Sequence, residues 1–196
     1  MLEWLSALDG NILLWIQEFL RVDLLNAVLS FYTKLGDSGL AWIAVSVIML
    51  IFPKTRRAGL LALLAMALGF LCTNVVLKHL VARPRPWLVV EGLTFLVVEP
   101  DPNSFPSGHA TCAFAAAGAW WRTLPRRWAK VTALVLAAVM AFSRLYVGVH
   151  FPSDVLVGCL VGFGCSQLVW LLWRRFRPEL RQVVAASVQQ QLGSVH

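Results

Sequence analysis

The sequence is poor in charge, because only 14% of its 196 residues are Asp, Glu, Lys or Arg. Soluble domains carry roughly 25% charged residues. Hydrophobic residues instead reach 59%, and the mean hydropathy is +0.71. This balance excludes an ordinary soluble domain. It predicts an all-α, polytopic membrane helix bundle that forms a single domain over residues 1–196.

Acidic residues are the scarcer charged class, with 10 Asp and Glu against 17 Lys and Arg, a net charge of +7. The basic residues lie in short clusters between apolar runs rather than along one solvated face, which excludes a nucleic-acid partner. No cluster of carboxylates suggests a bound divalent metal. We therefore expect no metal and no cofactor; the sequence leaves the oligomeric state open.

Paired cysteines and a secretory leader are also lacking. The four cysteines lie inside apolar runs, and none has the C-x-x-C spacing of a metal site, so they read as small buried hydrophobes. The N-terminus carries acidic residues and no basic start, unlike a cleavable signal peptide. Residues 1–20 predict an amphipathic helix that either lies along the membrane interface or leads into the first span.

Apolar runs long enough to suggest spanning helices recur along the chain. With flanking residues they predict about six transmembrane helices, near residues 12–32 (the weakest), 39–52, 58–77, 111–121, 131–142 and 155–173.

The basic clusters at residues 54–57, 122–130 and 174–181 follow the second, fourth and sixth predicted spans. Positively charged loops stay in the cytoplasm, so both termini are expected there, including a tail at 178–196. Residues 83–105 become an extracytoplasmic loop. We expect a multi-pass membrane protein whose outer edge faces the extracytoplasmic side.

Four cations, Lys78, Arg83, Arg85 and Arg144, break this bias by lying at the extracytoplasmic edge. A charged group at a membrane edge is a functional hypothesis by default, and its expected partner here is an anion. For Arg83 alone we favour simple snorkelling of a long side chain to the interface.

The same edge receives the stretch F-P-S-G-H, which ends at His109 and opens a predicted span. Ser107 and Gly108 would leave backbone amides free at a helix start, which suits a phosphate group. Arginine and lysine side chains would neutralise that phosphate. The sequence thus predicts a phosphate site built from several helix ends.

Two histidines at this edge can divide the work of phosphoryl transfer. One would attack phosphorus, and the other would protonate the leaving oxygen. His150 and Asp154 are four residues apart, which places them one helical turn from each other. A carboxylate there would fix the imidazole tautomer and stabilise the imidazolium. The alternative is that these residues form a polar turn between two membrane helices and have no catalytic role.

Three stretches together resemble the signatures of the type 2 phosphatidic acid phosphatase superfamily. K-H-L-V-A-R-P-R-P supplies Lys78 and Arg85, and the second is F-P-S-G-H. The third, S-R-L-Y-V-G-V-H-F-P-S-D, supplies Arg144, His150 and Asp154. The order and spacing match at every signature position.

The resemblance implies metal-independent hydrolysis of a membrane lipid phosphate through a phosphohistidine. It would make His150 the nucleophile, Asp154 its orienting partner and His109 the general acid. Five residues would bind the phosphoryl oxygens: Lys78, Arg85, Ser107, Gly108 and Arg144.

Bacterial members of the family act on several lipids, and we favour undecaprenyl pyrophosphate, from which the cell-wall carrier lipid is recycled. Phosphatidylglycerophosphate is the close alternative, and a lipid phosphotransferase also stays open. A transporter or flippase is the non-enzyme rival, but it would be expected to carry charged or broken segments at mid-membrane.

Overall fold

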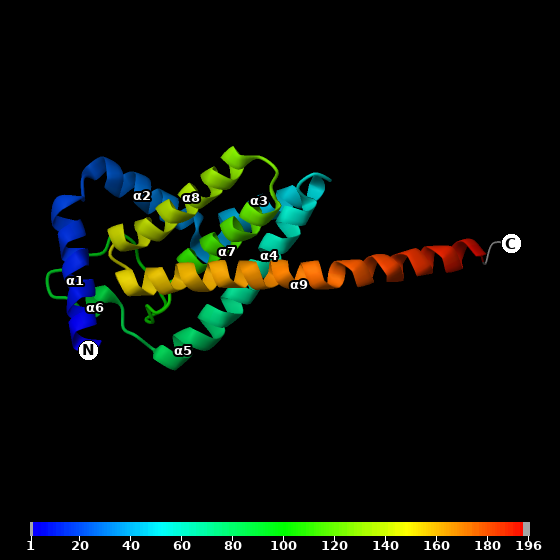
Figure 1. Ribbon diagram of the computed structural model, residues 1–196. Coiled ribbons are helices and arrows are strands. Elements are labelled where there is room, and N and C mark those ends of the chain that lie inside the picture. The colour runs from blue at the N-terminus through cyan, green and yellow to red at the C-terminus, as the bar shows by residue number, and fades with distance from the viewer. Residues whose placement is uncertain (1, 194–196) are drawn as a thin grey trace.

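The computed structural model describes the backbone of residues 2–193 and the side chains of residues 6–177, and there every regular element is helical (Figure 1). The elements are α1 (Leu2–Phe19), α2 (Asp23–Leu35), the 3-10 turn η1 (Asp37–Gly39), α3 (Leu40–Ile51), α4 (Arg56–Phe70), the π-helical η2 (Leu71–Leu77), α5 (Lys78–Val81), α6 (Pro86–Val89), α7 (Gly108–Thr123), α8 (Arg127–Tyr146) and α9 (Pro152–Gly193). The predicted all-α class is confirmed.

Helix α7 is the centre of the bundle, packed by α4, α8 and α9. Its buried residues are mostly alanines, and Ala113, Ala116 and Ala117 are fully enclosed. Small side chains let helix backbones approach closely, which is how helices associate when lipid surrounds them. Because α7 begins at Gly108, this packing also fixes the predicted phosphate cradle.

The contact between α7 and α9 depends on two glycines one turn apart, Gly158 and Gly162. A Cβ atom at Gly162 would lie 2.2 Å from the carbonyl oxygen of Thr111, and one at Gly158 would lie 2.6 Å from that of Ser107. Both distances are far below van der Waals contact, so only glycine allows this approach. The first turns of α7 and α9 are thereby held together.

The predicted membrane spans are matched in part. Within the described residues, three helices are long and apolar enough to cross a membrane, at Arg56–Val81, Arg127–Tyr146 and Pro152–Arg177. A fourth candidate is the pair Asp23–Leu35 and Asp37–Ile51, which is bent by 51°. The predicted span at 111–121 lies in α7, which has 16 residues. A count of six stays a prediction.

The weakest predicted span, residues 12–32, is not one helix, which corrects the sequence interpretation. The chain breaks between α1 and α2, and α1 runs crosswise to α9 in Figure 1. Tyr146 stabilises the break: its hydroxyl accepts from the Val22 amide at 3.1 Å, and its carbonyl accepts from Arg21 Nε at 3.0 Å. Residues 1–20 do form a helix as expected, and its position relative to the lipid stays a prediction.

The predicted loop at 83–105 is irregular apart from α6, and its two ends are joined. Ser104 N donates to the carbonyl of Arg83 at 2.8 Å, and Pro84 pairs with Asn103. The loop thus lies over the end of the bundle where α7 and α9 begin.

The basic clusters meet at the opposite end of the bundle. Arg57 lies over the ring of Trp173, while Arg122 and Arg174 lie over that of Trp170. The end of the bundle that carries the basic clusters and the end that carries the predicted site are therefore separated by the length of the helices. The expected tail at 178–196 continues α9 to Gly193; its side chains and residues 194–196 lie outside the described part.

Glycine packing between α7 and α9 can be tested with a matched pair of substitutions. Gly162→Ala should lower the melting temperature in detergent by several degrees, since overpacking costs about 1–3 kcal/mol. Gly164→Ala, where an added Cβ meets nothing within 4 Å, should not lower it. Equal melting temperatures for the two variants would contradict the close approach.

Candidate active site

A cavity of about 620 Å³ opens where α4, η2, α7 and the 83–105 loop meet. Among the residues that line it are five predicted site residues: Lys78, Arg85, Gly108, His109 and His150. Much of the remaining wall is apolar, with Ile43, Leu63, Met66, Phe70, Leu71 and Cys112. The structure therefore joins a cluster of polar groups to an apolar compartment.

The hydrogen-bond partners of His150 define its tautomer. Nη1 of Arg85 lies 3.0 Å from Nε2 of His150. A guanidinium has donors only, so Nε2 must present its lone pair, and in the neutral ring the proton is on Nδ1. Nε2 is therefore the ring nitrogen that presents a lone pair, and it lies on the Arg85 side of the ring.

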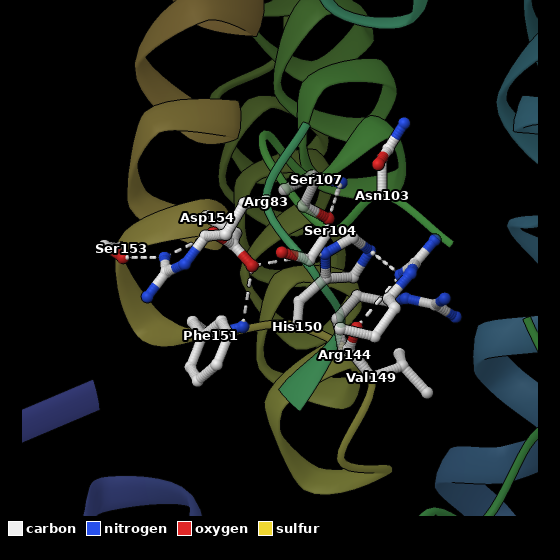
Figure 2. Close-up of polar contacts among 12 residues, drawn as sticks. Arg83, Asn103, Ser104, Ser107, Arg144, Val149, His150, Phe151, Ser153 and Asp154 are labelled. Atoms are coloured by element: carbon white, nitrogen blue, oxygen red, sulfur yellow. Dashed lines mark hydrogen bonds and ion pairs between the residues drawn. The ribbon is translucent and has the colours of Figure 1, made fainter. Parts of the chain in front are cut away.

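Asp154 lies on the other side of the ring, as predicted from the four-residue spacing. Its Oδ2 is 3.7 Å from Nδ1 of His150, longer than a hydrogen bond, and accepts from the Phe151 amide at 2.9 Å. Its Oδ1 accepts from Nη1 of Arg83 at 2.7 Å (Figure 2). A small shift would close the His150 contact, as often happens when a ligand binds.

The snorkelling interpretation of Arg83 is wrong. Its guanidinium lies between two carboxylates, with Nη2 2.8 Å from Asp9 Oδ2, and it stacks over the ring of Phe151 at 3.8 Å. The side chain is 18% exposed. The sequence argument failed because the partner Asp9 is 74 residues away in the chain.

His109 also has a carboxylate partner, which the sequence did not indicate. Its Nε2 lies 3.0 Å from Oδ1 of Asp37 in η1. A carboxylate accepts, so this nitrogen carries a proton. The two histidines thus differ at Nε2: His150 presents a lone pair there, and His109 presents a proton.

Carboxylates of the loop neutralise the predicted phosphate-binding cations. Glu99 contacts both Arg144, through Nη2, and Arg85, whose Nη2 is 3.3 Å away, and Asp101 pairs with Lys78. Burial alone would raise the pKa of Glu99, but the charges of Arg144 and Arg85 outweigh it and hold that pKa below its ordinary value. The anion expected at these cations is therefore supplied by the carboxylates of Glu99 and Asp101 in this structure.

Two predicted phosphate ligands lie behind the cavity wall. Arg144 is fully buried and reaches Thr33 as well as Glu99. Ser107 is also fully buried, and its amide donates to the Asp154 carbonyl at 3.0 Å, so the expectation that this amide is free is wrong. It instead joins the starts of α7 and α9, while its hydroxyl caps α7.

Sequence reasoning assigned no role to five residues that contact the site: Asp9, Thr33, Asp37, Glu99 and Asp101. An aspartate within an apolar helix was the one local signal for Asp9. Donor atoms of Asp37, Glu99 and His109 lie within 4.8 Å of one another, the arrangement of a three-ligand cation site. Glu99, however, already binds two arginines, whose charges oppose a further cation.

Comparison with known proteins identifies the family. The PAP2 superfamily matches residues 58–178, more than half of the chain and all three signatures. The chain belongs to the PAP2 superfamily. The resemblance predicted from the signatures is confirmed, and the chain is a hydrolase of the lipid phosphatase class.

Individual PAP2 proteins are similar over most of their length. An undecaprenyl-diphosphatase of Sulfolobus acidocaldarius is 32% identical over 76% of this chain and 70% of its own. The crystal structure of Aquifex aeolicus LpxE has a TM-score of 0.72 at 28% identity, covering 82% of this chain and 93% of that one. The transmembrane PAP2 type phosphatidylglycerolphosphate phosphatase of Bacillus subtilis gives 0.70 at 31%, covering 86% of each.

The environment of His150 predicts the pH dependence. Burial, and then the charges of Arg85 and Arg144, lower the pKa of His150 well below its ordinary value of 6.5. A lowered pKa keeps the imidazole neutral to more acidic pH. After correction for substrate ionisation, the acid limb of kcat/KM should therefore lie below pH 6.5. An acid limb centred at or above that pH, in protein shown to remain folded, would contradict the assignment.

Proposed function

We propose that this PAP2 protein is a metal-independent lipid phosphate or pyrophosphate phosphatase that acts through a phosphohistidine on His150. The observation that carries the proposal is the opposite state of the two histidines at one cavity. His150 offers a nitrogen lone pair beside Arg85, and His109 offers a proton.

In the first step, Nε2 of His150 attacks phosphorus while the bond to the leaving oxygen breaks. His109, as the imidazolium, gives a proton to that oxygen and becomes neutral, so the alcohol or lipid phosphate departs without an unstable charge. The His150 ring becomes positively charged on phosphorylation, and Asp154 stabilises it from the Nδ1 side.

In the second step, His109 accepts a proton from water, and the resulting hydroxide attacks the phosphohistidine. The phosphorus–nitrogen bond breaks, and its electron pair returns to Nε2. Phosphate leaves, and His109 is protonated again. Transfer to a second lipid instead of water would make the protein a phosphotransferase, which product analysis distinguishes.

Cations would stabilise the phosphoryl oxygens in both steps. Lys78 and Arg85 line the cavity, Arg144 reaches it once Glu99 withdraws, and Gly108 offers the first amide of α7. Preorganised charges of this kind do the work that a metal does elsewhere. Binding of phosphate requires Glu99 and Asp101 to give up their partners.

The apolar wall of the cavity supports a lipid substrate, because a prenyl or acyl chain can lie along it. We favour undecaprenyl pyrophosphate, and the undecaprenyl-diphosphatase of Sulfolobus acidocaldarius supports this choice. The B. subtilis phosphatase, covered to 86%, keeps phosphatidylglycerophosphate as the second candidate. The polar groups gather at one end of the bundle rather than at mid-membrane, which disfavours a flippase.

The membrane topology is part of the proposal. We propose six spans in a bacterial cytoplasmic membrane, both termini in the cytoplasm, and a site that opens to the periplasmic side. The collection of basic clusters at the end opposite the cavity supports this orientation.

The function is tested by phosphate release in detergent with EDTA present. Undecaprenyl pyrophosphate should be turned over faster than phosphatidylglycerophosphate or phosphatidic acid, and His150→Ala should abolish turnover of all three. A preference for a glycerolipid would replace the carrier lipid as substrate. Loss of activity in EDTA that one divalent metal restores, or near wild-type turnover by His150→Ala, would contradict the mechanism.

The competition between Glu99 and phosphate gives a second test. Glu99→Gln should strengthen inhibition by inorganic phosphate roughly tenfold, since the charged contact it removes is worth about 1.5–3 kcal/mol. The melting temperature without phosphate should fall, because Arg144 loses its counter-charge. Glu91→Gln, an exposed acid on the same loop, is the control. Unchanged or weaker phosphate inhibition in Glu99→Gln would show that Glu99 does not compete.

A further inference from the structure

Behind the proposed nucleophile lies a buried charge network that no signature residue except Asp154 belongs to. Arg83 is its centre. Nη1 donates to Asp154 Oδ1 and Ser153 Oγ, each at 2.7 Å, and Nη2 donates to Asp9 Oδ2 at 2.8 Å. The network connects α1, the start of the 83–105 loop and the first turn of α9.

Both carboxylates of this network are buried. Asp9 is 3% exposed and Asp154 is fully buried. Asp9 also accepts from Ser153, through both its amide at 3.2 Å and its hydroxyl. A long side chain held this way by three residues is not a solvated surface charge.

The network carries one more negative charge than positive charge. Asp9 and Asp154 are two carboxylates around one guanidinium, so one negative charge remains. Oδ2 of Asp154, the oxygen directed at His150, has no arginine on it; it accepts from the Phe151 amide. The excess charge is therefore available where an imidazolium would form.

We propose that Arg83 and Asp9 are positioning residues for the nucleophile: Asp9 holds one arm of Arg83, so that Arg83 binds Oδ1 of Asp154 and leaves Oδ2 for His150. This inference rests on the proposed function, in which His150 attacks phosphorus. Figure 2 shows Arg83 on the side of Asp154 away from the His150 ring. Arg83 is not among the residues that line the cavity where the proposed substrate phosphate would bind.

Each member then has a distinct role. Without Arg83, Asp154 is a buried carboxylate with no direct cation, free to rotate away from His150. Without Asp9, the guanidinium can turn both arms to Asp154, as carboxylates and arginines prefer. That pairing would neutralise Asp154 and draw Oδ2 away from the imidazole. Removal of either Arg83 or Asp9 should slow the attack of His150 on phosphorus without changing the apolar wall of the cavity.

The test compares Arg83→Gln, Asp9→Asn and the double variant with Arg21→Gln. Arg21 is a matched control, because it joins the end of α1 to Tyr146 and Thr94 by hydrogen bonds without contacting Asp154. Arg83→Gln should lower kcat on the order of 10- to 100-fold, the range for partners that orient a reactive ligand, with KM within about twofold. Asp9→Asn should lower kcat less, and the double variant should match Arg83→Gln, since the two act through one contact.

A second readout does not require turnover. Orthovanadate bonds to a histidine nucleophile, whereas inorganic phosphate only occupies the anion site. Arg83→Gln should weaken vanadate binding roughly tenfold, as kcat falls, and change phosphate binding less than twofold. Arg83→Lys, which keeps the charge, should recover part of the loss in kcat and part of the loss in vanadate affinity.

The outcomes separate this inference from the proposed function. Wild-type protein that neither releases phosphate from a lipid nor binds vanadate overturns the proposed function and this inference with it. Active wild-type protein in which Arg83→Gln behaves like Arg21→Gln, or raises KM with kcat unchanged, overturns the positioning role alone. Equal weakening of vanadate and phosphate also overturns it, because Arg83 would then support anion binding in general.

Discussion

Buried positive charge governs how the site, the loop and the helix ends around it are arranged. Arg85 and Arg144 are fully enclosed at one end of a helix bundle, where an unpaired cation would cost several kcal/mol. An anion must be present in every state of the protein. Glu99 supplies it in the structure described, and the proposed substrate phosphate would supply it during catalysis. The part of the loop that carries Glu99 is therefore part of the site, although Glu99 itself is not a signature residue.

The same logic of paired charge separates the two histidines. Arg85 directs a donor at His150, and Asp37 directs an acceptor at His109. The roles proposed for them follow from these neighbours rather than from the histidines themselves, which are identical side chains close to the starts of α7 and α9. Close packing of α7 on α9, through Gly158 and Gly162, brings these ends to one cavity. Packing and electrostatics thus act on the same few residues.

Much of the site could be predicted from the sequence because its residues come in short, spaced signatures. Lys78, Arg85, His109 and His150 were expected together and do line one cavity. The prediction failed where the partner is distant in the chain. Arg83 was interpreted as a surface charge because nothing near it in sequence is acidic, and the Ser107 amide was expected to be free although it bonds to the Asp154 carbonyl.

The helical class and the family could be read from the sequence alone, and so could the residues proposed to react. Apolar run lengths, basic clusters and signature spacing are local properties that survive without coordinates. Only the tertiary structure decided the break at residues 20–22, the bent pair of α2 and α3, and the partners of each charge. Many of these depend on contacts between segments far apart in the chain, such as Asp9 with Ser153, which are 144 residues apart. No local pattern encodes such contacts, because burial of charge is resolved only when the whole bundle is packed.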